Sequence, residues 1–357
     1  MHLRSLYLHN FRIYEEAFYE FGPKINVISG PNARGKTSIL EAIYFLMTGR
    51  SFRQTQVSDM IRHGASSFYI EASFIKHGIE QTLRVHCSGK DRRIVYNNTL
   101  CASSSDLLGL LLGAVIHPDD ATVVKGAPEA RRHLLDVQIA QANPLYIHHL
   151  TRYNRAMRQR NHLLRAKTAA TIESWEHEMA NSAAYIVYQR LQTIEDLQEK
   201  GQRLHNLICG GNDTLELAYK SAAVLRSISV ADIDILQLRT YYLEQYSKQR
   251  KREMELGVTL IGPHKDDVFI GLNTNEARFF ASEGQQRSCV AALRLAEWEC
   301  LKANSYEMPL MLIDDVGMSL DYSRRTRLFS HLPALEQVFL TTTEELNLPG
   351  NTHTISV

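Results

Sequence analysis

The sequence lacks several features that would assign it to a class at once. Its five cysteines have no C-x-x-C spacing, which disfavours zinc and disulfide frameworks and leaves reduced thiols as the default. The longest apolar stretch, LLGLLLGAVI at 107–116, is too short to span a bilayer, and the N-terminus has no signal-peptide pattern. No internal repeat, low-complexity tract or proline-rich linker is present. We therefore expect a cytoplasmic protein. The cysteines are Cys87, Cys101, Cys209, Cys289 and Cys300.

An excess of one charge is also absent. The chain has 40 lysines and arginines against 39 aspartates and glutamates, and its net charge of +1 argues against a generally basic nucleic-acid binder. Its hydrophobic content of 44% excludes a disordered chain. Its 357 residues suffice for a core domain plus an insertion. The indications of function therefore lie in local motifs.

A glycine-rich turn, called here the phosphate loop (residues 30–37), carries the strongest motif. GPNARGKT fits G-x-x-x-x-G-K-[ST], with a short apolar segment before it and an apolar-periodic segment ending at Gly49 after it. This order predicts strand, loop and helix, with backbone N–H groups and the helix N-terminus binding phosphate oxygens. Lys36 is expected to reach the β- and γ-phosphates of ATP, and Thr37 to bind Mg²⁺. The expected nucleotide contacts are Gly30, Pro31, Asn32, Ala33, Arg34, Gly35, Lys36 and Thr37.

A second apolar segment ends in two carboxylates. PLMLIDDVG at 309–317 is typical of a buried parallel strand, and open α/β sheets bind ligands at the C-terminal edge of such strands. Asp314 is the candidate to hold Mg²⁺, directly or through water. Asp315 is the candidate to orient or deprotonate the attacking water, and it forms the predicted catalytic pair with Lys36. The alternative is that these are two solvated acids at the end of a strand without a function. The presence of the phosphate loop makes the functional interpretation the more favoured one.

The segment 282–285, called here the SGQ loop, opens a further predicted helix. Ser282, Gly284 and Gln285 at a helix N-terminus would form a second anion site. Serine and glycine begin many helices, so these three residues alone are weak evidence for a nucleotide site. Their position, after a long insertion and before Asp314, makes the evidence stronger.

Further segments occur in the order of one known family. They are LYLHNFRIYEE and GRSFR around the phosphate loop, HPDDATVVKGAPEARRHLLD at 117–136, YNRAMRQRNHLLR at 153–165, and GPHKDD at 262–267. With the phosphate loop, the SGQ loop and LIDDV, the chain resembles the RecF family, recombination mediators among the ABC-type ATPases that also include Rad50 and SMC proteins.

The resemblance implies an α/β fold, a P-loop ABC-type ATPase head with an inserted mainly α-helical lobe. It implies that Ser282, Gly284 and Gln285 of one subunit contact the γ-phosphate bound by another, so that ATP holds an ATP-dependent homodimer closed over DNA. Slow, DNA-stimulated hydrolysis would reopen it. The implied partners are gapped or junction DNA, RecR and RecO, and indirectly RecA and SSB, in recombinational repair, replication restart and the SOS response.

Basic residues concentrate between Arg131 and Lys167, where Asp136 is the sole acidic residue. Such charges would neutralise DNA phosphates without reading bases. A solvated helix face is the alternative, and for a second cluster at 248–252 the two interpretations are evenly balanced. The expected DNA contacts are Arg131, Arg132, Arg152, Arg155, Arg158, Arg160 and Arg165.

These motifs predict one ATPase domain split by a helical lobe. Residues 1–120 would form its N-terminal half with the phosphate loop, 121–255 the mainly helical lobe with a basic face, and 256–357 the C-terminal half with the SGQ loop and the acidic strand.

Three positions depart from the family pattern. Ala33 replaces a glycine, and if that position needs a positive φ, strain of about 1 kcal/mol would weaken nucleotide binding without abolishing it. Met318 and Ser319 replace Ser and Glu, so communication between two nucleotide sites is expected to differ, whereas Asp321 is retained. The candidates for a glutamine that senses the γ-phosphate are Gln54 and Gln56.

Other functions remain to be weighed. A transporter-type nucleotide-binding subunit would share the motifs, but its SGQ loop would be closer to the phosphate loop and a histidine would follow the last strand, where this chain has Thr341 to Thr343. A Rad50- or SMC-like tether would need hundreds of heptad residues. A small-molecule kinase has no need of the SGQ loop. A structural paralogue that binds no nucleotide is the last alternative.

Overall fold

The computed structural model describes residues 1–357 except 54, 90, 212, 224–232, 316–319, 345 and 347. The chain forms two compact units, which are described separately. The first unit comprises Met1–Val124, Lys200–Asp213 and Phe280–Val357, and the second comprises Lys125–Glu199 and Thr214–Phe279. This division differs from the predicted one in three places: residues 121–124 and 200–213 of the predicted helical lobe belong to the first unit, and residues 256–279 belong to the second.

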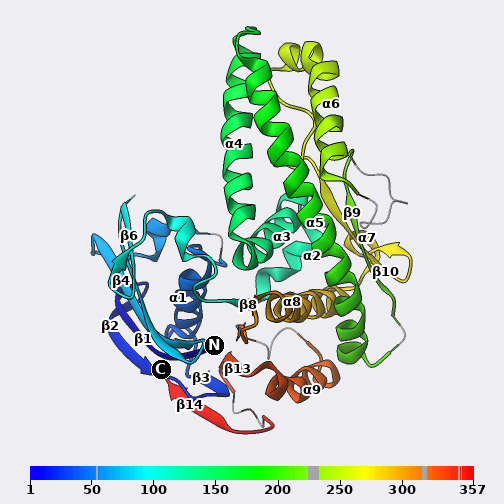
Figure 1. Cartoon of the computed structure of the whole chain (residues 1–357). Helices are drawn as coiled ribbons and strands as arrows, with labels where there is room; N and C mark the ends of the chain where they lie inside the picture. The colour runs from blue at the N-terminus through cyan, green and yellow to red at the C-terminus, as the bar shows by residue number, and fades with distance from the viewer. Residues whose placement is uncertain are drawn as a thin grey trace. The chain divides into compact units, whose positions relative to one another are not determined.

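A parallel sheet in the first unit carries the predicted site. Its strand order is β14-β3-β13-β12-β8, and all neighbouring strands are parallel. Strands from distant parts of the sequence thus become neighbours, as β3, β13 and β14 show in Figure 1. β3 is followed by the phosphate loop, and β12 by Asp314. The predicted apolar strands at 25–28 and 310–313 are confirmed. The strands are β3 (Ile25–Ser29), β8 (Gly113–Ile116), β12 (Leu310–Ile313), β13 (Gln337–Thr342) and β14 (Thr352–Ser356).

An antiparallel sheet forms the second layer of this unit, with strand order β2-β1-β4-β5-β6-β7. Side chains alternate along β4, where Phe68, Ile70, Ala72 and Phe74 are buried and the residues between them are partly exposed. This period of two fits a sheet with one covered face. The strands are β1 (His2–Phe11), β2 (Tyr14–Glu20), β4 (Ser67–Lys76), β5 (Ile79–Ser88), β6 (Asp91–Tyr96) and β7 (Thr99–Leu100).

Helix α1 (Lys36–Thr48) joins the two sheets into one core. Every residue of α1 except Thr37 is buried, and its apolar side chains pack with residues of both sheets. The protein therefore encloses α1 on all sides, and polar side chains such as Glu41 are buried with the apolar ones. Gly49 ends α1 in the left-handed conformation, as predicted, and donates its N–H to Phe45 O at 2.7 Å.

Other helices of the first unit are α8 (Glu283–Ser305) and α9 (Tyr322–His331), which follow the SGQ loop and β12 in sequence. The short α2 (Ala121–Lys125) and the 3₁₀ helices at Val57–Met60, Ser104–Leu107, Pro118–Asp120 and Leu332–Leu335 complete the described elements of this part. Within the described residues, none of the helices combines the length and the apolar character that crossing a membrane requires.

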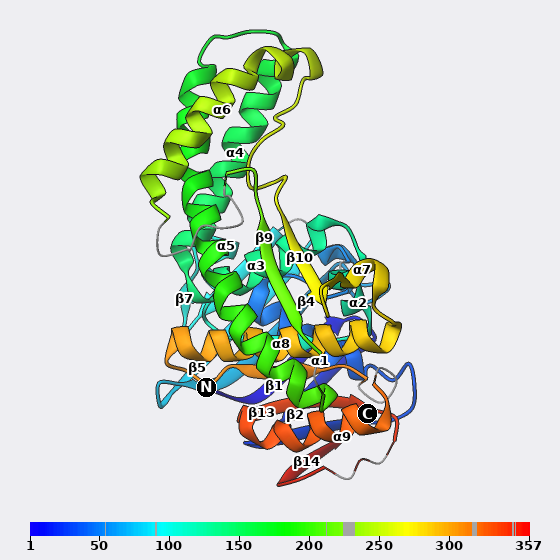
Figure 2. The ribbon, with the colours of Figure 1, turned by 90° about the vertical axis from the view of Figure 1, so that its right-hand side faces the viewer.

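The second unit is mainly helical, as predicted, but it also contains a small sheet. Helices α4, α5 and α6 lie side by side in Figures 1 and 2, and β11-β10-β9 form an antiparallel sheet. Met179, Ile186 and Leu197 form part of a buried apolar seam along α5. The elements are α3 (Pro128–Ala142), α4 (Pro144–Arg165), α5 (Ile172–Cys209, whose last turns belong to the first unit), β9 (Leu215–Lys220), α6 (Ile235–Leu256), β10 (Asp267–Leu272), β11 (Asn275–Glu276) and α7 (Ala277–Phe280).

The GPHKDD segment of the second unit contains a histidine and an aspartate whose pKa values are shifted in opposite directions. Burial lowers the pKa of His264 to about 4; its Nδ1 accepts a hydrogen bond from the Tyr153 hydroxyl at 2.6 Å, and its Nε2 donates to Thr259 O at 3.2 Å. Burial raises the pKa of Asp266 to about 6, although the Tyr219 hydroxyl donates to it at 2.8 Å. Acidification therefore lowers the folding stability that depends on His264 and raises the folding stability that depends on Asp266.

We predict that His264 makes this unit sensitive to mild acid. Below its unfolded pKa of 6.5 the unfolded chain takes up a proton that the folded ring refuses, so stability falls until about pH 4. The loss should reach about 2 kcal/mol at pH 5. Asp266 gains stability between pH 6 and 3.8 and partly masks this loss. Urea unfolding of the wild type and of His264→Gln at pH 7 and pH 5 separates the two contributions.

The difference in unfolding free energy between wild type and His264→Gln should shrink by about 2 kcal/mol from pH 7 to pH 5, since Asp266 is common to both proteins. A difference that stays constant over this range would contradict the assignment.

Candidate functional site

The phosphate loop has the backbone conformation that an anion cradle requires. Its positive φ angles are 155° at Gly30, 64° at Ala33 and 98° at Gly35. A Cβ on Gly35 would lie 2.5 Å from the Tyr14 hydroxyl oxygen and 2.8 Å from Ile13 Cδ1, so this position needs glycine for space as well as conformation. Pro31, Asn32, Ala33 and Arg34 are exposed on the rim of the loop.

Ala33 therefore has the left-handed backbone conformation on which the predicted strain depended. Replacing it by glycine should relieve about 1–2 kcal/mol, of which about 0.5–1 kcal/mol is offset by the greater freedom of glycine in the unfolded chain. We expect Ala33→Gly to stabilise the first unit by roughly 0.5–1 kcal/mol in urea unfolding without nucleotide. The matched control is Ala303→Gly, at an exposed position of α8, which should instead be destabilising. If both substitutions changed the free energy of unfolding by the same amount, Ala33 would not be strained.

Lys36 is buried at the first turn of α1 and folds back onto the loop. Its Nζ donates to Gly30 O at 2.6 Å and to Pro31 O at 2.8 Å. The ammonium group is thus positioned at the concave side of its own loop by neutral carbonyl acceptors. Phosphate oxygens are stronger acceptors for this group than carbonyl oxygens.

The acidic end of β12 meets the phosphate loop directly. Thr37 Oγ1 donates to Asp314 Oδ1 at 2.9 Å, which brings the two expected Mg²⁺ ligands together. Thr341, at the end of β13, donates to the same Asp314 oxygen at 2.7 Å and accepts the N–H of Asp315 at 2.9 Å. Asp315 has a φ of 49°, a strained conformation that is enriched at functional sites. Thr341 therefore holds both carboxylate residues, a role that the sequence run of threonines did not reveal.

Asp314 is buried, and this burial raises the pKa of its carboxyl group despite the hydrogen bonds from Thr341 and Thr37. The charges of Arg53 and His117 act in the opposite direction. His117 and Asp314 also line one pocket, together with Arg287 of α8. No sequence pattern indicated that His117 lies near the acidic strand, because parallel strands β8 and β12 pair only in the folded sheet.

A buried ion cluster fixes α8 beside this sheet. Arg294 donates to Asp120 Oδ2 at 3.2 Å and to Glu297 Oε2 at 2.8 Å. Burial acts to raise the pKa of Asp120, but Arg294 and His117 outweigh it and lower this pKa to about 2. The cluster positions the helix that begins at the SGQ loop.

The SGQ loop forms a reciprocal capping box at the N-terminus of α8. Ser282 Oγ accepts the Gln285 N–H at 3.3 Å, and Gln285 Oε1 accepts the Ser282 N–H at 2.9 Å. Ser282 is exposed and Gly284 is half-buried, and a Cβ on Gly284 would lie 2.9 Å from Nη1 of Arg324 in α9. The helix start was predicted correctly, and its exposed first turn has the N–H groups of an anion site.

The predicted DNA contacts separate into exposed and buried side chains. Arg131 and Arg160 must be removed from the set, because both are buried and ion-paired, Arg131 to Asp267 at 2.7 Å and Arg160 as described below. Arg132 is half-buried and donates to Asp266 O at 2.7 Å. The exposed members on α4 are Arg152, which is paired with Glu178, Arg155, Arg158 and Arg165.

Three further predicted positions, Met318, Ser319 and Gln54, lie outside the described residues. Gln56, the other candidate sensor of the γ-phosphate, instead caps the 3₁₀ helix Val57–Met60, and its N–H bonds Asp59 at 3.0 Å. In the second basic cluster, Lys248 pairs with Glu244 at 3.0 Å.

Known proteins are similar to this chain over nearly its whole length. The model of the RecF/RecN/SMC N terminal domain family matches residues 2–357. The DNA replication and repair protein RecF of Protochlamydia amoebophila is 52% identical over 96% of this chain and 94% of its own length. The chain belongs to the RecF family. The transporter-type alternative is accordingly not favoured.

Solved structures agree with this RecF-family assignment and with the predicted α/β fold class. The recombination mediator protein RecF with ATP, in the RecFOR pathway, matches with a TM-score of 0.91 and 27% identity, covering 99% of this chain and 95% of that chain. An SMC head bound to the C-winged helix domain of ScpA, with a TM-score of 0.54 and 15% identity over 97% and 91% of the two chains, is similar in fold alone.

Proposed function

We propose that this RecF-family chain is an ATP-dependent DNA-binding protein of recombinational repair, replication restart and SOS induction. The observation that carries the proposal is the hydrogen bond of 2.9 Å between Thr37 Oγ1 and Asp314 Oδ1, which joins the phosphate loop to the acidic strand. The names of the relatives, and the ATP in the similar RecF structure, support the same function.

The oxygen ligands at this contact suit Mg²⁺, which prefers carboxylate, hydroxyl and phosphate oxygens. Thr37 and Asp314 would hold the ion, and bound Mg²⁺ would neutralise charge on the phosphates. Burial raises the pKa of Asp314 although the charges of Arg53 and His117 lower it, and a bound cation would further favour the ionised carboxylate. Thr341 would keep the Asp314 carboxylate oriented.

ATP hydrolysis would depend on Lys36 and Asp315. On ATP binding, the Lys36 ammonium would exchange its bonds to Gly30 O and Pro31 O for bonds to phosphate oxygens. Asp315 would orient or deprotonate the attacking water. We infer slow, DNA-stimulated turnover, because ATP binding serves to hold an assembly and hydrolysis to release it.

The SGQ loop would complete the nucleotide site of a second copy. Ser282, Gly284 and Gln285 would contact the γ-phosphate bound by the partner, so ATP would drive homodimerisation. The reciprocal caps of Ser282 and Gln285 support this role by ordering the first turn of α8 before a partner arrives.

DNA would bind through phosphate contacts of the exposed arginines on α4. Each phosphate that they neutralise would release counterions, which makes the affinity dependent on salt rather than on sequence. Gapped or junction DNA is the proposed substrate. The proposed partners are RecR and RecO, and indirectly RecA and SSB, in the cytoplasm. The proposed DNA contacts are Arg152, Arg155, Arg158 and Arg165 of α4, together with the half-buried Arg132 of α3.

Sedimentation velocity with ATP and Mg²⁺, with and without gapped duplex DNA, tests the proposal. We expect a dimer with nucleotide and a larger DNA-bound species with the duplex. Gly284→Glu should abolish the dimer while leaving ATP binding intact, because the new carboxylate would repel the partner's γ-phosphate. If the wild-type protein sedimented as a monomer under saturating nucleotide, the dimer mechanism would be refuted, although the fold assignment would stand.

A further inference from the structure

Three metal-ligating side chains come together where α5 ends in the first unit. His205 and Cys209 lie one helical turn apart at the end of α5, and Asp213 lies four residues after the helix ends. One ligand atom of each residue lies within 4.8 Å of the other two, and His205 Nε2 is 3.4 Å from Cys209 Sγ. None of these residues belongs to the nucleotide site described above.

The local sequence explains why the chain turns back at this point. Gly210 ends α5 in the left-handed conformation, with a φ of 63°, and its N–H bonds Asn206 O at 2.8 Å. A Cβ on Gly210 would lie 2.2 Å from the Arg327 guanidinium, so a larger residue would not fit. Gln202 Nε2 then donates to Asp213 O at 3.1 Å, which holds the returning chain against the helix.

The buried imidazole gives a second, independent indication of a ligand. The His205 side chain is fully buried, and its Nδ1 has no hydrogen-bond partner among the described residues. Within these residues, the ring contacts the weakly bonding thiol of Cys209, whose Sγ lies 3.4 Å from Nε2. The nitrogen beside Cys209 is Nε2, and a buried nitrogen with only a weak thiol contact would gain from an ion bound between it and the thiolate.

We propose that His205, Cys209 and Asp213 bind a divalent transition-metal ion of the zinc type. An imidazole nitrogen, a thiolate and a carboxylate are the ligands that Zn²⁺ takes in proteins, whereas Mg²⁺ and Ca²⁺ prefer oxygen alone. Tetrahedral Zn²⁺ places its nitrogen and sulfur ligands about 3.5 Å apart, close to the distance between His205 and Cys209. Cys209 and Asp213 are partly exposed, which leaves a route for the ion and a position for water.

The site communicates with the SGQ loop through one serine. Ser288 of α8 forms a side-chain hydrogen bond with Cys209, and its Oγ donates to Gly284 O at 2.8 Å. An ion would replace the thiol proton, so Cys209 could then only accept from Ser288. Metal binding would thereby change the hydrogen bonding of the first turn of α8. The positive charge of Arg324 acts on both His205 and Cys209 and would repel the ion, whereas the Cys209 thiolate and the Asp213 carboxylate would attract it.

Cobalt titration of the metal-free full-length protein tests this proposal, because thiolate-bound Co²⁺ has a charge-transfer band in the near ultraviolet. We expect one such ion per chain, displaced by Zn²⁺, and binding more than about 10-fold weaker in Cys209→Ser and Asp213→Asn. The matched control, Cys101→Ser, should leave the band unchanged. Co²⁺ at the oxygen ligands of the nucleotide site would give no thiolate band, so the two sites are distinguishable.

A protection experiment in the wild type avoids dependence on the folding of variants. Zn²⁺ should slow the alkylation of Cys209 by N-ethylmaleimide but not that of Cys101, as mapped by peptide mass spectrometry. Thermal unfolding should shift to higher temperature with Zn²⁺ in the wild type and not in Asp213→Asn. Absence of the thiolate band at saturating Co²⁺, an unchanged band in Cys209→Ser, or equal alkylation rates with and without Zn²⁺ would overturn the proposal.

Discussion

Replacing Lys36 by alanine is expected to weaken ATP binding by about 100-fold or more. The ammonium group is buried beside the loop and can form at least two charge-assisted hydrogen bonds to phosphate oxygens, each contributing about 1.5–3 kcal/mol. Losing roughly 3 kcal/mol corresponds to about two powers of ten in the dissociation constant. Calorimetric titration with a slowly hydrolysed ATP analogue and Mg²⁺ measures the change. The ATP-dependent dimer should disappear with it at analogue concentrations that saturate the wild type.

The matched control is Lys24→Ala, before β3. Lys24 is half-exposed and paired with Glu336 at 3.2 Å, so its loss should leave ATP affinity within about threefold of the wild type. A Lys36→Ala protein that binds ATP as tightly as the control would contradict the nucleotide site. If it also dimerised on DNA without nucleotide, the structural paralogue would become the better interpretation.

The sequence allowed the main elements of the nucleotide site to be predicted because its motifs are local. A short glycine loop determines its own backbone, and the apolar segment that ends at Asp314 is a complete strand. The helix start at Ser282 was equally recognisable, because a capping box depends on residues three apart. Even the positive φ at Ala33 could be stated as a condition in advance.

Contacts between distant strands and helices could not be predicted in this way. Thr341 and His117 come to Asp314 only through the pairing of β13 and β8 with β12, which the sequence does not encode locally. The cluster of His205 and Cys209 was missed because its spacing is that of one helical turn rather than C-x-x-C. Charge runs were similarly ambiguous, since a basic side chain on a helix can face solvent or a buried acid. Arg160 shows this most clearly.

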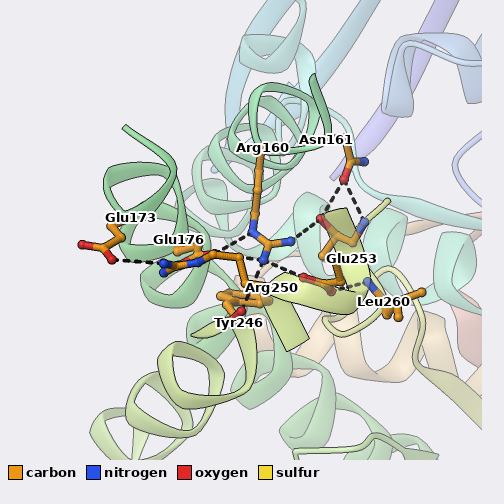
Figure 3. Close-up of polar contacts among 9 residues, drawn as sticks. Arg160, Asn161, Glu173, Glu176, Tyr246, Arg250, Glu253 and Leu260 are labelled. Atoms are coloured by element: carbon orange, nitrogen blue, oxygen red, sulfur yellow. Dashed lines mark hydrogen bonds and ion pairs between the residues drawn. The ribbon is translucent and has the colours of Figure 1, made fainter. Parts of the chain in front are cut away.

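Arg160 is the centre of a buried ion network in the second unit (Figure 3). Its guanidinium donates to Glu176 Oε1 at 2.9 Å, to Glu253 Oε2 at 2.6 Å and to Thr259 Oγ1 at 2.9 Å. Glu253 is fully buried and also accepts the Leu260 N–H at 2.6 Å. The network thus joins α4, α5, α6 and the segment after α6. Its cation is enclosed by protein and has no access to DNA.

Arg160→Ala is expected to destabilise the second unit by about 3–5 kcal/mol, because it leaves the buried Glu253 carboxylate without a cation. Glu176 should suffer less, since Arg250 still donates to it at 2.6 Å. Urea unfolding monitored by circular dichroism measures the loss. The control, Arg158→Ala, removes an exposed side chain of the same helix and should change stability by less than about 0.5 kcal/mol.

A double variant separates loss of packing from loss of charge. Arg160→Met retains much of the side-chain volume but leaves Glu253 unpaired, so it should remain strongly destabilised. Adding Glu253→Gln removes the buried charge and keeps an oxygen acceptor for Leu260 N–H. The double variant should therefore be more stable than Arg160→Met alone. If the second change instead destabilises further, the unpaired carboxylate is not the cause, and Arg160 acts mainly by filling space between the three helices.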